Sequence, residues 1–280
     1  MPAGQHVRRI PRGDIKLKDR IAKGGFAKVF RGEWHGALVV VKRLELEDGA
    51  REIPSQVLYE TAAVIHSSHP NVIRIFGVVE DFTSDPDEPF IGIVMEYFED
   101  GALYRHVGEG MTAAAARTAL LDIAHGLAAV HAQGFAHLDL KSANVLVRKA
   151  GGGLRAVVTD FGLARALEAS GSFVSRMSAG TPAYMAPEQL SDEGEGLSSD
   201  MYSFGVIIWE LATGQRPWAE LKGNLFKIQK AVVHNKARLA FPDDLGADWA
   251  PLVALAERCF ADDRQARPTA DEAAEELANM

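Results

Sequence analysis

Cysteine is almost absent from this chain of 280 residues. The only one is Cys259, so no disulfide can form within the chain. Disulfides persist in oxidising compartments and are rare in the cytosol. The sequence gives no support for a secreted, disulfide-bonded scaffold, and we expect a reducing, cytoplasmic location.

Long hydrophobic runs are missing as well. A membrane-spanning helix needs about 18 or more consecutive apolar residues, and the apolar run Met201–Trp209 is about half that length. The first residues, MPAGQHVRRIPRGD, are charged and lack the apolar centre of a secretory signal. We therefore expect neither a signal peptide nor insertion into a membrane.

The chain also lacks a surplus of positive charge. The chain has 30 lysine and arginine residues against 38 aspartate and glutamate residues, a formal net charge of −8. This balance disfavours bulk attraction to nucleic acid, so no nucleic-acid partner is expected. The hydrophobic share of 47% is large enough to build a core, which excludes disorder as the main theme. The length allows one large domain or two lobes.

The composition changes near residue 97, from strand patterns to helix patterns. Short segments rich in β-branched and aromatic residues predict strands at 15–23, 27–35, 37–45, 72–80 and 90–98, with one helix at 55–68. An alanine-rich helix is predicted to begin after the N-cap Thr112 and to stop at Gly134. Further helices are predicted at 198–213, 248–260 and 270–280. The fold class is α+β, with two lobes that meet at a cleft.

Two segments of the first half suggest contacts to phosphate. The segment IAKGGFAKVFRG lies between two predicted strands, where it is read either as a phosphate-covering loop or as a plain hairpin turn. Lys42 ends the apolar run Val39–Val41, and Glu60 lies on the apolar side of the following helix. A carboxylate that points inward needs a cation, and Lys42 is the candidate. The alternatives are a solvated lysine and a solvated helix face.

Two segments of the second half carry acidic and amide groups beside short apolar strands. They are HLDLKSANVLV, residues 137–147, and VVTDFGLAR, residues 157–165. Asp139 can accept a hydroxyl proton, and Lys141 can neutralise a transferring phosphate. Asn144 and Asp160 supply the hard oxygen ligands that Mg²⁺ prefers.

In their order along the chain, these segments resemble the eukaryotic-type protein kinases over about residues 15–278. The further elements of the set are HPN at 69–71, MEYFEDGAL at 95–103, GTPAYMAPE at 180–188, SSDMYSFGVIIWEL at 198–211 and ARPT at 266–269. The runs DLKSAN and GTPAYMAPE are similar to the serine/threonine class. The run SSDMYSFGVIIWEL adds tyrosine-kinase-like features of the mixed-lineage and plant-receptor-like type.

The resemblance implies the bilobal protein kinase fold, with a small β-rich N-lobe that carries one main helix and a larger, mainly helical C-lobe. The implied divisions are an N-terminal extension at 1–14, an N-lobe at 15–96, a hinge at 97–101 and a C-lobe at 102–280. The implied activity is transfer of the ATP γ-phosphate to protein hydroxyls in a signalling role, with ATP and Mg²⁺ as cofactors. We expect regulation to come from partner proteins or from sequence outside this chain.

The resemblance also implies roles for the residues that carry the chemistry. Asp139 orients and deprotonates the acceptor hydroxyl, flanked by Lys141 and Thr181. Asn144 and Asp160 hold Mg²⁺.

For the nucleotide, the resemblance implies that Lys42 binds the α- and β-phosphates and pairs with Glu60. Met95 is the gatekeeper, and the backbone of Glu96 and Phe98 meets the adenine. The implied nucleotide-binding set is Ile21, Ala22, Lys23, Gly24, Gly25, Val29, Val40, Lys42, Met95, Glu96, Phe98 and Leu146.

Other positions match structural parts of the family. Asp200 is expected to hold the backbone of the 137–144 segment, and Glu188 is expected to pair with Arg267. Cys259 matches a buried core position. The stacked apolar spine of the family matches Val64, Ile75, His137 and Phe161.

Three departures from the family pattern affect the mechanism. Ala22 and Ala27 replace two glycines of the phosphate loop, Val40 replaces an alanine over the adenine, and Leu138 replaces the arginine of H-R-D. That arginine normally binds a phosphate on the activation segment. The chain is therefore of the non-RD type, and the alternative function is a weakly active or inactive pseudokinase that acts as a binding or scaffold module. A small-molecule phosphotransferase is disfavoured by GTPAYMAPE, which shapes the peptide site in the family.

Overall fold

The structure is a computed structural model that describes most of the chain. The residues that it describes are 7–23, 27–45, 61, 64, 68–81, 90–108, 111–150, 153–161 and 181–280. They form two compact units, the first from residues up to 68 together with 73–99, and the second from 69–72 together with the described residues from 100 onward. Several predicted residues lie outside the described ones, namely Gly24, Gly25, Glu60, Ser170, Ser172, Ser175 and Ser178.

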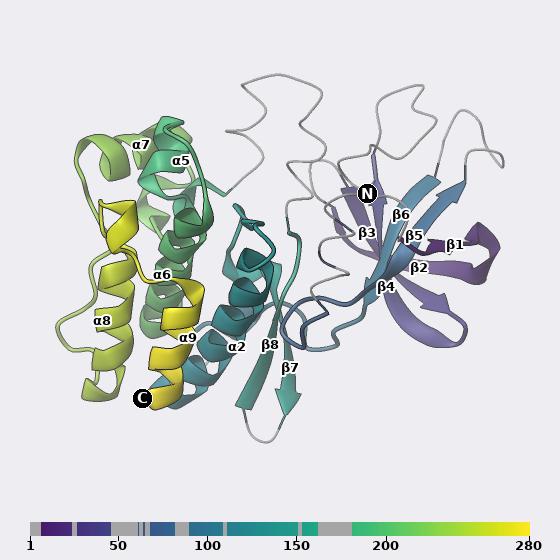
Figure 1. Cartoon of the computed structure of the whole chain (residues 1–280), viewed down its shortest axis with the longest axis horizontal. Coiled ribbons are helices and arrows are strands. Elements are labelled where there is room, and N and C mark those ends of the chain that lie inside the picture. Colours follow the sequence, from purple (N-terminus) through teal and green to yellow (C-terminus); the bar gives the residue numbers. More distant parts are fainter. Residues whose placement is uncertain are drawn as a thin grey trace. The chain divides into compact units, whose positions relative to one another are not determined.

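The first unit is built on a six-stranded sheet with the order β1-β5-β6-β4-β3-β2 (Figure 1). All neighbouring strands are antiparallel except β1, which runs parallel to β5. The strands are β1 Arg9–Ile10, β2 Ile15–Lys23, β3 Ala27–Trp34, β4 Ala37–Leu44, β5 Ile75–Asp81 and β6 Phe90–Glu96. The five predicted strands are therefore present. Of the helix expected at 55–68 the structure describes Thr61 and Val64, which are helical, and Ser68, which is not.

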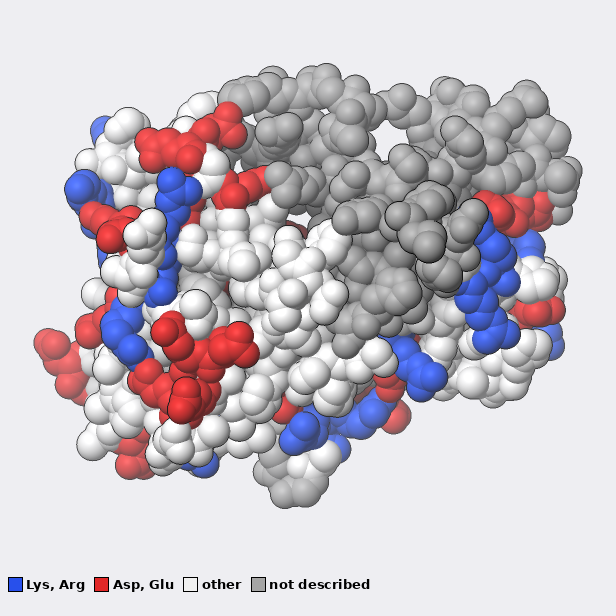
Figure 2. Space-filling view, viewed as in Figure 1, with Lys and Arg blue, Asp and Glu red and all other residues white. Residues whose placement is uncertain are grey.

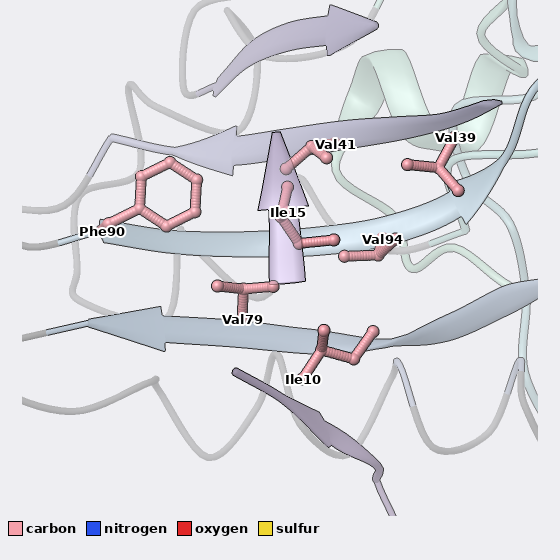
Figure 3. Packing of buried hydrophobic residues seen from close by; sticks show 7 residues of the cluster. All are labelled: Ile10, Ile15, Val39, Val41, Val79, Phe90 and Val94. Carbon is pink, nitrogen blue, oxygen red and sulfur yellow. The ribbon is translucent and has the colours of Figure 1, made fainter. Parts of the chain in front are cut away.

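The core of this sheet is made of β-branched and aromatic side chains that meet on one face. Val39 and Val41 are two residues apart on β4, so they point to the same side, toward Val94 on β6. Figure 3 shows this cluster, which consists of Ile10, Ile15, Val39, Val41, Val79, Phe90 and Val94. Such residues suit strands because they fit a pleated, buried surface.

Residues before the first predicted strand belong to this core, which corrects one expectation. Segment 1–14 was expected to precede the sheet, yet Arg9–Ile10 pairs with Val78 and Val79 of β5. Ile10 is buried within the cluster of Figure 3. Two residues are too short a run to give a strand pattern, so only the packing of Ile10 reveals β1.

The second unit consists of helices and one hairpin. The helices are α2 Ala113–His131, α5 Pro187–Ser191, α6 Leu197–Thr213, α7 Leu225–Gln229, α8 Ala250–Cys259 and α9 Ala270–Asn279, and the hairpin strands are β7 Val145–Ala150 and β8 Gly153–Val158. Helix α2 packs against α9, β8 and α6, and α6 packs against α8. Every residue of α6 from Ser199 to Leu211 is buried, so this helix is the centre of the unit. The predicted α+β fold class, with a β-rich part and a helical part, is confirmed.

Helix α2 follows its predicted boundaries closely. The Thr112 hydroxyl accepts a hydrogen bond from the Ala115 N–H, which caps the helix start. The helix ends at His131, and Gly134 adopts the positive φ of 79° that turns the chain away. By length and composition alone α2 is apolar enough to cross a membrane, but 56% of that window is buried inside the protein. Its apolar residues are thus used as the core of a folded unit.

Acidic side chains gather over α9, as Figure 2 shows. The helix has the sequence ADEAAEELAN, with Asp271 and Glu272 in its first turn. Thr269 caps it, and the hydrogen bonds from Thr269 lower the pKa of Glu272. Carboxylates at this end are stabilised by the positive end of the helix dipole.

Gly205 allows α6 to approach α8 closely. A Cβ at this position would lie 2.7 Å from Cβ of Cys259 and 3.0 Å from Cε1 of Phe260. Cys259 is fully buried, and burial raises the pKa of its thiol to about 12. The cysteine is therefore a packing residue, as expected.

We predict that Gly205→Ala destabilises the protein by about 1–3 kcal/mol, because the added methyl overpacks the contact between α6 and α8. Urea unfolding followed by tryptophan fluorescence measures this loss. The control is Gly246→Ala, since a Cβ at Gly246 meets nothing within 4 Å. Its effect should stay within about 0.5 kcal/mol. Equal unfolding midpoints for the two variants would contradict the assigned contact.

Candidate active site

Four predicted residues of the second unit come together around one carboxylate. Nζ of Lys141 donates to Oδ2 of Asp139 at 2.7 Å and to Oγ1 of Thr181 at 2.9 Å. Nδ2 of Asn144 donates to the same Oδ2 at 3.0 Å and to the backbone oxygen of Asp139 at 2.9 Å. The Asp139 and Lys141 side chains are 22% and 18% exposed, so solvent and substrate can reach them. The carboxylate is held in one orientation by a cation and an amide.

A buried carboxylate of α6 fixes the backbone before Asp139. Oδ2 of Asp200 accepts the N–H of His137 at 2.7 Å, and Oδ1 accepts the N–H of Leu138 at 2.7 Å. Nε2 of His131 is 2.8 Å from Oδ2 of Asp200. Asp200 is 0% exposed, so its charge depends on these donors. The expectation that Asp200 holds this segment is confirmed.

His137 joins the segment to the end of β8. Its Nε2 is 2.8 Å from the backbone oxygen of Thr159, and its ring centroid is 4.7 Å from that of Phe161. The N–H of Thr159 donates to the backbone oxygen of Asn144 at 2.9 Å. These contacts hold Asp160, which follows Thr159, at the end of the hairpin strand.

Leu138 and Asp160 both adopt the left-handed backbone region, with φ of 63° and 65°. This region disfavours residues with a side chain, and a leucine there is an outlier. The surrounding bonds hold it, since the Leu138 N–H donates to Asp200 and its oxygen accepts from Nε2 of Gln189 at 3.1 Å. Both bonds use the main chain, so they do not depend on the side chain at position 138.

A second polar network lies beside Lys141. The hydroxyl of Tyr184 donates to Oε2 of Glu210 at 2.7 Å and is 3.2 Å from Oγ of Ser142. Burial raises the pKa of Glu210, and burial together with that carboxylate raises the pKa of Tyr184. The network ties Ser142 to the segment that contains Thr181 and to α6.

Glu188 and Arg267 form the expected ion pair. Nη1 and Nη2 of Arg267 donate to the two carboxylate oxygens of Glu188 at 2.7 and 2.9 Å, and Ser199 adds a bond at 2.8 Å. Burial alone would raise the pKa of Glu188, but the hydrogen bonds and charge of Arg267 outweigh burial and lower it. The side chains are 4% and 0% exposed, so this pair is buried.

The predicted nucleotide-binding residues of the first unit lie on or next to four neighbouring strands, β2, β3, β4 and β6. Lys42 of β4 is paired with Val29 of β3, and Val40 is paired with Met95 of β6. Val40 and Met95 are buried. Ile21, Ala22 and Lys23 end β2, where Ala22 is paired with Val29. Glu96 is the last residue of β6, and Phe98 lies just beyond the end of that strand. Leu146 belongs to β7 of the second unit.

The residues fit a magnesium ion by the chemistry of their donors. Nδ2 of Asn144 donates both of its hydrogen bonds to Asp139. Oδ1 of Asn144 can therefore serve as an oxygen ligand for the metal. Over the described part of the chain, no group of three or more His, Cys, Asp or Glu residues forms a metal site. Mg²⁺ in phosphoryl transfer uses one or two side-chain oxygens together with substrate phosphates, so such a group is not required.

Comparison with known families identifies the class of protein. The protein kinase domain matches residues 15–277, which is nearly the whole chain. The chain belongs to the protein kinase family. The fold of the two units and the group around Asp139 agree with this family.

Individual relatives narrow the class. The chain is 39% identical over 267 residues to the serine/threonine-protein kinase CTR1 of Arabidopsis thaliana, covering 93% of this chain and 31% of that protein. It is 34% identical over 280 residues to mitogen-activated protein kinase kinase kinase 10 of Homo sapiens, covering 95% of this chain and 28% of that protein. The serine/threonine-protein kinase PkaA of Streptomyces coelicolor is 31% identical over 266 residues, or 94% of this chain and 46% of that protein. The resemblance to the serine/threonine class is confirmed, and the chain spans less than half of each relative.

Sequence reasoning missed several residues that hold this site. His131, Ser142, Tyr184, Gln189 and Glu210 were not predicted to take part. Each is an ordinary polar residue in the sequence, and its role comes from partners between 26 and 69 positions away along the chain. The sequence offered one signal for these residues. Glu210 stands in the apolar part of α6, and a buried carboxylate needs a polar partner.

We predict that Glu188→Gln destabilises the protein by about 3–5 kcal/mol at neutral pH, because it leaves the Arg267 charge buried without a carboxylate. Since the pKa of Glu188 is lowered on folding, the pair adds stability that is present above the ordinary glutamate value of about 4.3. This stability is lost as the pH falls through the lower folded-state pKa.

The difference between the wild type and Glu188→Gln should therefore shrink in urea unfolding between about pH 7 and about pH 3. Glu257→Gln, on the exposed face of α8, is the control and should show no such change. A constant difference at all pH values would remove the ionic contribution assigned to Glu188.

Proposed function

We propose that this chain is an active serine/threonine protein kinase, which transfers the γ-phosphate of ATP to hydroxyl groups of proteins with the help of Mg²⁺. The observation that carries the proposal is the Asp139 carboxylate held between Lys141 and Asn144, with Thr181 beside Lys141. Relatives named serine/threonine-protein kinases support the same acceptor class. A cytoplasmic location stays a prediction.

In the proposed reaction, Asp139 orients the acceptor hydroxyl and takes its proton. The hydroxyl oxygen bonds to the γ-phosphorus, and the bond between that phosphorus and the bridging oxygen breaks, so ADP leaves. Lys141 neutralises the charge on the transferred group, and Thr181 keeps the Lys141 ammonium in place. Phosphoryl transfer needs mainly such positioning and neutralisation.

Other residues of the chain would hold the nucleotide and the metal. Lys42 binds the α- and β-phosphates in partnership with Glu60, as in other members of the family. The apolar side chains of Val29, Val40 and Leu146 contact the adenine. Asn144 and Asp160 would supply oxygen ligands to Mg²⁺, which when bound would offset the negative charge of the phosphates.

We also propose that this kinase is of the non-RD type. The Leu138 side chain carries no positive charge that could bind a phosphate. Its backbone N–H and oxygen nevertheless form hydrogen bonds with Asp200 and Gln189. The segment that carries Asp139 is thus held without an arginine. Activity then does not depend on a phosphate bound at position 138.

The competing proposal is a pseudokinase that acts as a scaffold. It is favoured by Ala22 and Ala27, which replace two glycines of the phosphate loop. Both lie in strands: Ala22 is paired with Val29 next to a register shift of β2, and Ala27 is paired with Leu44. Neither residue has a positive φ, so their backbone does not require glycine. This favours the active enzyme.

The decisive experiment incubates the purified chain with labelled ATP, Mg²⁺ and a generic protein acceptor, followed by phosphoamino-acid analysis. Label on serine or threonine is expected. Nucleotide binding without any transfer of label would favour the scaffold, and label on tyrosine alone would contradict the acceptor class.

We predict that Asp139→Asn lowers the rate of transfer by about 100-fold or more, because an amide cannot accept the hydroxyl proton. Lys42→Met should lower it by a similar factor, about 100-fold, through loss of phosphate neutralisation. The controls are Asp192→Asn and Lys149→Met, two exposed positions with the same changes of side chain. Full activity in either site variant, with the fold intact by circular dichroism, would reject the assigned role.

We predict that replacement of Ser170, Ser172, Ser175 and Ser178 by alanine together leaves the rate of transfer within a few-fold. These serines precede Thr181 in the sequence, and a phosphate on any of them would not find an arginine at position 138. Steady-state kinetics of the fourfold variant measures the effect. Near-total loss of activity would show that another cation performs the switch.

A further inference from the structure

A cavity in the second unit is separate from the residues around Asp139. Its volume is about 360 Å³, and it lies among the last residues of α2, the first residues of α6 and the segment that leads into α9. Pockets for small ligands begin at about 300 Å³. Neither Asp139 nor the residues bonded to it line this cavity.

The wall of the cavity is mostly apolar. It is formed in large part by Ala132, Leu197, Met201 and Pro268. Leu197 is 41% exposed although it is a large apolar side chain. A ligand with an apolar body would cover this surface and remove it from water.

The charged groups of the cavity favour an acid. Nη1 of Arg264 donates to the backbone oxygen of Gly194 at 2.6 Å, and within the described part of the chain Arg264 forms no ion pair. Asp271 also lines the cavity, but it stands in the first turn of α9, where the helix dipole offsets its charge. Arg264 is exposed and its printed bond goes to a backbone oxygen, so its guanidinium can accept a carboxylate of a ligand as a charged partner.

Two further lining residues connect the cavity to the candidate active site. His131 lines the cavity, and its Nε2 is 2.8 Å from Oδ2 of Asp200, which accepts the N–H groups of His137 and Leu138. Arg267 is the other, and its guanidinium holds Glu188. A molecule in the cavity therefore lies beside residues that bond to both buried carboxylates.

We infer that this cavity is a regulatory site for a small molecule with an apolar body and one carboxylate. A ligand that fits the cavity as it stands stabilises the arrangement in which His131 is bonded to Asp200. The segment before Asp139 is then held more firmly. The inference goes beyond the proposed phosphoryl transfer, and its test does not rely on that activity.

The first test uses a disulfide tether at Ser198, which lines the cavity and makes no side-chain hydrogen bond in the described part of the chain. The variant Ser198→Cys carries one accessible thiol, because Cys259 is fully buried. The matched control is Ala114→Cys, since Ala114 is exposed and is likewise the second residue of a helix, in this case α2. Equal helix positions give the two thiols similar reactivity.

Each variant is labelled by exchange with the symmetric disulfide of naphthylethanethiol or of mercaptoethanol, which releases one thiol, and intact mass reports the concentration of reductant that removes half of the label. At Ser198→Cys the naphthyl label should resist about tenfold more reductant than the mercaptoethanol label, because its ring is buried in the cavity. At Ala114→Cys the two labels should be released together. If the ratio of the reductant concentrations for the two labels were the same at both positions, the proposed ligand site would be contradicted.

Hydrogen exchange tests the connection to the Asp139 segment. The naphthyl label at Ser198→Cys should slow exchange of the His137 and Leu138 amides about fivefold, since both amides are bonded to Asp200. The label at Ala114→Cys should leave them unchanged. Unchanged exchange in a fully labelled Ser198→Cys protein would overturn the regulatory role.

The carboxylate is tested with free naphthoate and its neutral analogue naphthamide, by NMR titration of the otherwise unmodified chain. Arg264→Gln should weaken naphthoate about fivefold and leave naphthamide unchanged. The control Lys227→Gln removes one exposed positive charge from α7, outside the cavity. An equal loss of naphthoate binding in both variants, or tighter binding of naphthamide than of naphthoate, would contradict the acid preference.

Discussion

The buried carboxylate of Asp200 is the interaction on which the candidate active site depends. It is fully buried in α6 and accepts bonds from His131 and from the backbone of His137 and Leu138. A buried carboxylate without hydrogen-bond partners is costly, so the fold keeps these N–H groups in place beside Asp200. The hydrogen bonds that this buried carboxylate requires thus fix the path of the chain immediately before Asp139.

Helix α6 supplies most of the other supports, because it is buried on every side between Ser199 and Leu211. A helix in this position meets several elements at once. Its Ser199 bonds to Glu188, and its Glu210 accepts the hydroxyl of Tyr184. Residues that are far apart in the sequence are brought together because they share this one rigid partner. The bare hydrogen of Gly205 lets α8 approach closely enough to complete the packing.

The parts of this arrangement that could be predicted are those with a local signal. Strands such as Ala37–Leu44 show β-branched residues in sequence, and the order of motifs along the chain is enough to identify Asp139, Lys141, Asn144 and Thr181. The short strand Arg9–Ile10 has no pattern of its own, and its burial depends on packing with β5. Contacts such as that of Ser142 with Tyr184 combine two unremarkable residues, so only the folded chain reveals them.

Leu138 departs from the family sequence, but the bonds that hold it are made by its main chain. The residue sits at a φ of 63°, which an isolated leucine disfavours, and it is held there by bonds of its own N–H and oxygen. Because these bonds belong to the main chain, an arginine and a leucine at position 138 satisfy them equally. What the arginine would add is a cation for a phosphate, and that is a means of regulation. In the proposed non-RD kinase, Leu138 would lack this means of regulation, while the bonds of the Leu138 N–H to Asp200 and of Asn144 to Asp139 are present.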